Sequence, residues 1–69
     1  NPNHVDLPDE LAEALGAWPE AEAAFAQHSG AMRRAMARKV ADAKRPETRA
    51  RYAVELAERL AQGAHPFRA

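Results

Sequence analysis

Cysteine is absent from these 69 residues, and aromatic residues and glycine are scarce: one Trp, one Tyr, two Phe and three Gly. Without cysteine, the chain forms no disulfide and offers no thiolate nucleophile. No apolar run approaches the roughly 18 residues that a membrane-spanning helix needs, and no secretory signal pattern is present. We therefore expect a cytoplasmic domain, or a periplasmic one if a leader has been removed.

Large apolar side chains are also few. Alanine supplies 18 of the hydrophobic residues, and only fourteen are larger. At roughly 1.5–3 kcal/mol for each fully buried large side chain, such a core stabilises a small fold only marginally. We expect one domain over residues 1–69 with its core in residues 7–62. A homodimer or a fused neighbouring domain would add buried surface.

The spacing of the apolar residues predicts an all-α fold, a compact bundle of three to four short helices. Pro8 and the acidic residues after it favour the start of a first helix, which Gly16 ends. Pro19 starts a second helix, and Phe25 is its buried residue. Ser29 is a natural N-cap for the third helix.

The third helix is predicted over residues 30–43 and the fourth over 46–62, and together they are expected to form the main hairpin. Tyr52 and Leu56 face inward on the fourth helix, whereas Val54 falls off that stripe. The ends of the chain are expected to be flexible, over residues 1–6 and 63–69, with Phe67 as the residue that could fold back.

Pro46 marks the junction between these two helices. Lys44 and Arg45 suit the negative end of a finishing helix, and Glu47 suits the positive end of a new one. Proline lacks an N–H, so it fits the first turn of a helix and disrupts an interior. The alternative is one long helix over residues 30–62 with a kink at Pro46.

Charge is segregated along the chain although its net value is zero. Residues 1–28 hold six acidic side chains and no Lys or Arg, whereas residues 33–51 hold eight of the ten basic side chains and two acidic ones. Such a chain can clamp its own halves together, associate head to tail, or present a basic face to an anion.

Five residues are candidates for partner binding: Trp18, Arg34, Arg38, Lys44 and Arg45. Trp18 lies at an interhelical turn, where an exposed indole would anchor a contact and a buried one would close the small core. The basic residues are either a solvated face or a site for a protein, a nucleic acid or anionic lipid. No aromatic residue interleaves with them and no helix-turn-helix signature occurs, so nucleic acid ranks second.

Arg49 lies seven residues before Leu56 and therefore near the buried stripe of the fourth helix. A charge there needs a partner, and Glu10 or Glu13 of the acidic first helix is expected to supply one. Thr48 is expected to support the helix start through its hydroxyl.

No catalytic, cofactor or metal site is predicted. The three histidines, His4, His28 and His65, are dispersed and lack metal-ligand spacing. A bundle of this size can hardly enclose a substrate pocket, so we do not expect an enzyme.

Two segments give the chain a resemblance to a known family: Leu7-Pro8-Asp9-Glu10-Leu11-Ala12-Glu13-Ala14-Leu15 and Ala43-Lys44-Arg45-Pro46-Glu47-Thr48-Arg49. With Pro19-Glu20-Ala21 and Ser29 between them, they resemble the YdeI/OmpD-associated family. The resemblance covers roughly residues 5–62. It implies a small helical domain in bacterial proteins tied to bacteriocin protection, with no established catalytic activity and no catalytic residues to transfer.

The chain departs from that family at a few positions. Trp18 stands where relatives usually have a capping aspartate, and His28 where they have an apolar residue. The function expected from the resemblance is a non-catalytic protein-interaction module, linked to resistance to antimicrobial peptides. The alternative is nucleic-acid or polyanion binding through residues 33–51.

Overall fold

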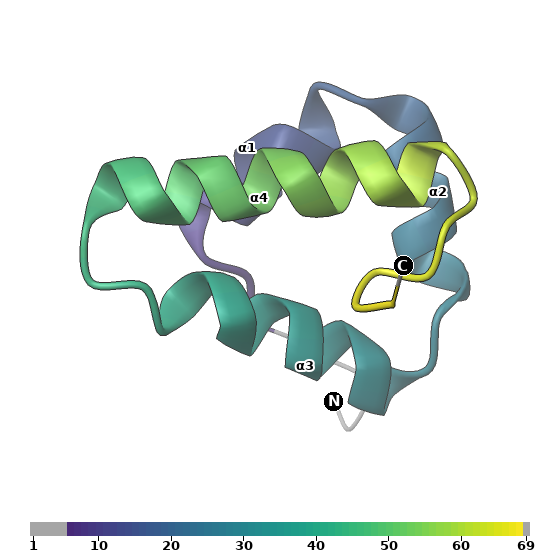
Figure 1. The fold of residues 1–69 in the computed structure, drawn as a ribbon. Coiled ribbons are helices and arrows are strands. Elements are labelled where there is room, and N and C mark those ends of the chain that lie inside the picture. Colours follow the sequence, from purple (N-terminus) through teal and green to yellow (C-terminus); the bar gives the residue numbers. More distant parts are fainter. Residues whose placement is uncertain (1–5, 69) are drawn as a thin grey trace.

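The computed structural model describes residues 6–68, which form four helices and no strand (Figure 1). Their bounds are α1 Asp9–Gly16, α2 Pro19–Gln27, α3 Gly30–Ala41 and α4 Pro46–Ala61. The predicted all-α bundle is confirmed. Residues 1–5, the greater part of the start expected to be flexible, lie outside the described residues. Within 6–68, no helix has the length and hydrophobicity needed to cross a bilayer.

Prolines set where α1 and α2 begin. Pro8 occupies the N-cap of α1, and Pro19 is in the first turn of α2, where its missing N–H costs nothing. Trp18 is the N-cap of α2, and its side chain makes no capping hydrogen bond. Its carbonyl instead accepts from the backbone N–H groups of Ala21 and Glu22, both at 3.0 Å.

Ser29 caps α3 as expected, because its hydroxyl accepts a hydrogen bond from the Met32 N–H at 3.2 Å. The helix ends at Ala41, two residues earlier than predicted. Arg45, which precedes a proline, has an extended backbone (φ −100°, ψ 140°), as the proline ring requires. The alternative of one kinked helix over 30–62 is therefore wrong.

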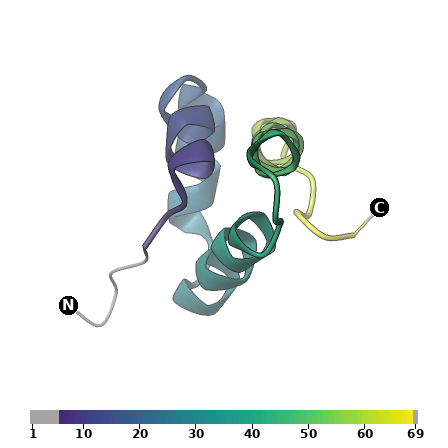
Figure 2. The same cartoon turned by 90° about the vertical axis from the view of Figure 1, so that its left-hand side faces the viewer.

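α4 is the central helix and packs against the other three. Its contact with α1 and α2 is more extensive than its contact with α3, so the expected α3–α4 hairpin is not the main interface. Figure 2 shows α1 and α2 on one side of α4, with α3 below them. The core is apolar throughout and uses small residues where helices approach closely. Its buried residues are Leu11, Leu15, Ala21, Phe25, Met36, Ala37, Val40, Ala53, Leu56, Ala57 and Leu60.

The inward prediction holds for Phe25 and Leu56, whereas Tyr52 is only half-buried and packs against the edge of the core. Val54, which falls off the stripe, is 51% exposed. Alanine fills much of the space on the inner face of α4, so that face needs few large side chains.

Gly63 ends α4 and turns the chain back. Its φ of 76° is the left-handed conformation that glycine adopts without steric cost. The Gly63 N–H donates to the Leu60 carbonyl and the Ala64 N–H to the Arg59 carbonyl, which is the Schellman pattern. The tail then folds back so that Pro66 is buried, while Phe67 remains 42% exposed.

Candidate functional site

The outward face of α3 combines small and basic side chains. Ala31, Arg34, Ala35 and Arg38 are all exposed, and together they line an open hollow of about 550 Å³. Residues three and four apart share one face of a helix. Because the buried residues of α3 lie on the face toward the core, these four face solvent. The result is a row of two alanines beside a row of two arginines.

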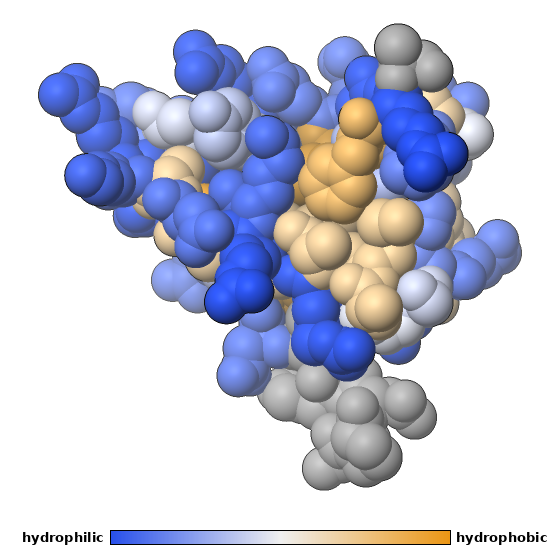
Figure 3. All heavy atoms as spheres, turned by 60° about the horizontal axis from the view of Figure 1, so that its bottom comes forward, coloured by the Kyte–Doolittle hydropathy of each residue, from blue (hydrophilic) through white to orange (hydrophobic). Residues whose placement is uncertain are grey.

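Figure 3 views the molecule from the side of α3. Apolar side chains gather near the middle of this face, and strongly hydrophilic ones surround them. Phe67 of the tail lines a second hollow together with Lys39 of α3 and Tyr52 of α4, with a volume of about 280 Å³. An apolar centre with a charged rim is the usual make-up of a protein–protein contact surface.

The α3–α4 loop extends the basic surface beyond the end of α3. Lys44 and Arg45 are exposed in this loop. Among residues 6–68, the side chains of Arg34, Arg38, Lys44 and Arg45 take part in no hydrogen bond and no ion pair. These four, which we call the free basic set, are the basic residues that the sequence singled out for partner binding.

Arg49 is used inside the fold. Its Nε donates to the Glu10 carboxylate at 3.2 Å, and its Nη1 donates to the carbonyls of Ala43 and Lys44 at 3.1 and 3.2 Å. The guanidinium thus joins α4 to α1 and also holds the carbonyls that follow α3. Of the two carboxylates expected to pair with Arg49, Glu10 does so, whereas Glu13 is exposed.

The pKa of Glu10 lies below its ordinary value. The main cause is a hydrogen bond from its own backbone N–H at the start of α1, and burial partly opposes it. The hydrogen bond and the positive charge of Arg49 lower it further. This carboxylate is therefore kept charged as a structural group.

Two other arginines also hold backbone carbonyls. Arg33 donates to Ala26 and His28 at 3.1 and 2.5 Å and so secures the end of α2. Arg59 donates to the carbonyls of His65 and Arg68 in the tail. No structural role for Arg33 was predicted from the sequence. Its place four residues after the Ser29 cap, within reach of the α2 end, was the available signal.

Tyr52 contacts the two remaining basic residues of segment 33–51, Lys39 and Arg51. The Lys39 ammonium lies 4.6 Å and the Arg51 guanidinium 5.7 Å from its ring centroid, both within cation–π range. Thr48 donates its backbone N–H to the Arg45 carbonyl, but within the described chain its hydroxyl makes no hydrogen bond. The expected hydroxyl support for the start of α4 is therefore not found.

Trp18 does not join the basic face. It is half-buried against the core in the α1–α2 turn. That turn lies at the opposite side of the bundle from α3 in both ribbon views (Figures 1 and 2). The predicted partner-binding residues thus form two separate surfaces.

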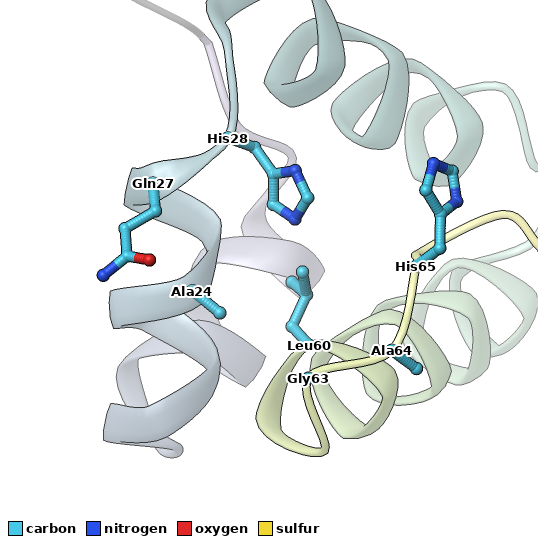
Figure 4. Close-up of a pocket in the computed structure, with 7 residues that line it drawn as sticks. All are labelled: Ala24, Gln27, His28, Leu60, Gly63, Ala64 and His65. Atoms are coloured by element: carbon cyan, nitrogen blue, oxygen red, sulfur yellow. The ribbon is translucent and has the colours of Figure 1, made fainter.

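A pocket that the sequence did not indicate lies between α2, the end of α4 and the tail (Figure 4). Its volume is about 470 Å³, and His28 and His65 stand on opposite sides of it with Leu60 between them. The turn at Gly63 brings His65 back to this position, which spacing along the sequence does not reveal. No carboxylate lines the pocket, and among residues 6–68 no group of three or more potential ligands could hold a metal ion.

Comparison with protein families matches residues 4–63 to the family described as Bacteriocin-protection, YdeI or OmpD-Associated. The chain belongs to this family. The match spans all four helices and both segments on which the resemblance was based. Neither the curated proteins nor the solved structures give a match to this member of the family.

Proposed function

We propose that this member of the YdeI/OmpD-associated family is a non-catalytic protein-interaction module that docks the outward face of α3 and the α3–α4 loop onto an acidic protein surface. The observation that carries the proposal is the division of labour among the basic residues. Arg33, Arg49 and Arg59 hold the fold together, whereas the free basic set points to solvent without a partner among residues 6–68.

The chemistry of this face favours carboxylates as its targets. A guanidinium presents a planar fork of donors that matches a carboxylate, and it desolvates more readily than an ammonium. Ala31 and Ala35 let a partner approach the helix closely beside Arg34 and Arg38. Burial of these alanines would add to the attraction between charges.

A non-catalytic role is also supported by the hollows themselves. Those on α3 and beside Tyr52 are open, and the pocket of His28 and His65 lacks a carboxylate that would orient or charge an imidazole. We therefore propose that the domain binds a partner and does not catalyse a reaction. The proposed location is the cytoplasm. Protection against bacteriocins or other antimicrobial peptides would be the cellular outcome of such binding.

Nucleic-acid binding through residues 33–51 is the alternative, and the free basic set supports it in part. The structure supports nucleic-acid binding less well than binding to an acidic protein, because only part of the basic segment is free. Two of its eight basic residues hold backbone carbonyls and two more lie on Tyr52. Tyr52 itself is half-buried, so it is poorly placed to stack on a base.

A labelled acidic helical peptide tests the proposal by fluorescence anisotropy, with mixed-sequence duplex DNA as the second probe. We expect the peptide to bind, and the double variant Arg34→Glu and Arg38→Glu to weaken binding about tenfold or more. Arg51→Glu is the control, because Arg51 is exposed on α4 and outside the free basic set.

Equal loss in the control and in the double variant would contradict the proposal, as would the absence of peptide binding. Tighter binding of the duplex than of the peptide, with an affinity that falls steeply between about 50 and 200 mM salt, would favour the alternative.

A further inference from the structure

We infer that the acidic surface recognised by α3 is the α1–α2 turn of a second copy of this chain, so that copies associate head to tail. The inference rests on the proposed function, because it uses the same face of α3. It explains why the predicted binding residues fall on two opposite sides of one molecule. Between two copies, those surfaces would meet.

Charge complementarity supports this occupant. Glu13 of α1 and Glu20 and Glu22 of α2 are exposed, and among residues 6–68 they form no ion pair. No Lys or Arg occurs within residues 1–28 to neutralise them. Each molecule therefore presents free carboxylates at one side and the free basic set at the other.

The side chains also match in kind. Trp18 is a half-buried indole at the acidic turn, and the hollow on α3 has an alanine floor with Arg34 and Arg38 beside it. An indole is the preferred aromatic partner of a guanidinium. Trp18 would lie over the alanines, next to the row of arginines, and Glu20 would pair with one of those arginines. Aromatic and arginine residues in such positions commonly carry the binding energy of an interface.

The geometry determines the kind of assembly. The two surfaces differ and lie on opposite sides, so the contact is heterologous and does not use the same patch on both molecules. Such contacts extend into chains or close into rings rather than stopping at a two-fold dimer. The average mass is therefore expected to rise with concentration beyond that of a dimer.

Sedimentation velocity of the full chain tests this first. Between about 10 µM and 1 mM protein at about 50 mM salt, we expect a rising average mass, and near 500 mM salt the rise should be largely lost through screening. A strictly monomeric chain throughout at low salt would overturn the inference. So would a dimer that grows no further, or an average mass that does not respond to salt.

Two variants then separate the surfaces. The first carries Arg34→Glu and Arg38→Glu, and the second carries Glu13→Gln and Glu20→Gln. Each variant blocks one surface and keeps the other. Each alone is therefore expected to self-associate at least about tenfold more weakly than the original chain. Mixed in equal amounts, they should form a complex of one copy of each that grows no further. Glu58→Gln, on the exposed side of α4, is the matched control and should associate like the original chain.

Circular dichroism of each variant shows whether its helices are intact. If the mixture stays monomeric while both variants are folded, the inference is wrong. The acidic-peptide experiment distinguishes this result from failure of the proposed function, because an acidic peptide would still bind α3 if only the second copy were the wrong partner.

Discussion

At the scale of single residues, three arginines replace the tertiary contacts that a larger core would supply. Arg33, Arg49 and Arg59 each bridge a helix to the carbonyls at the end of another segment. A guanidinium suits this task because its donors are fixed in one plane and it is always charged. Lysine at these positions would keep the positive charge but lack the planar set of donors that bonds two carbonyls at once.

Glu10 should make the stability of the fold depend on pH in the acid range. Because its pKa is lower in the folded chain than its ordinary value of 4.5, folding is favoured when Glu10 is charged. That contribution is complete above about the ordinary value and is lost as the pH falls through the lowered pKa. Thermal unfolding between neutral and strongly acid pH should show that the melting-temperature difference between the original chain and Glu10→Gln shrinks on acidification.

The control for that experiment is Glu13→Gln, because Glu13 is exposed on the same helix and does not contact Arg49. A difference between Glu10→Gln and the original chain that stays constant with pH would contradict the role given to this carboxylate.

Ser29 gives a second test at this scale. Its hydroxyl satisfies the Met32 N–H at the start of α3, so Ser29→Ala should destabilise the fold by about 1 kcal/mol. Ser29→Asp restores an acceptor and should recover most of the loss. Chemical denaturation measures both variants, and a Ser29→Ala chain as stable as the original would show that the cap contributes nothing.

At the scale of elements, the helix starts were readable from the sequence and the ends less so. Pro19, Ser29 and Pro46 begin three of the helices where their backbone chemistry predicts. The predicted end of α3 is two residues too late, because the last turn tightens and the Ala43 N–H donates to the Val40 carbonyl, three residues back. The pocket of His28 and His65 was not predictable, since it depends on the direction of the tail after Gly63.

The packing of α4 predicts a sharp contrast between two of its neighbouring residues. Leu56 is 2% exposed and Val54 is 51% exposed. Leu56→Ala should therefore destabilise the fold by about 2–5 kcal/mol, whereas Val54→Ala should change it by about 0.5 kcal/mol or less. Urea denaturation distinguishes them. Similar losses for the two variants would mean that α4 presents a different face to the core.

At the scale of the whole molecule, the net charge is zero but acidic and basic side chains lie on different sides. The acidic side carries the α1–α2 turn with Trp18, and the basic side carries α3 and the α3–α4 loop. The sequence revealed this segregation, but only the fold shows that the two sides face away from each other. That separation turns one list of candidate residues into two complementary surfaces.

Amide-resolved NMR of the labelled chain, titrated with an acidic helical peptide at low protein concentration, tests the binding face most directly. We expect shifts in α3 and residues 42–45 at about 50 mM salt, strongly reduced near 200 mM, because exposed charges are screened over this range. The amides around Val54 on the exposed side of α4 should not respond. Shifts spread evenly over the four helices, or confined to the α1–α2 turn, would contradict the assignment of α3 as the recognition face.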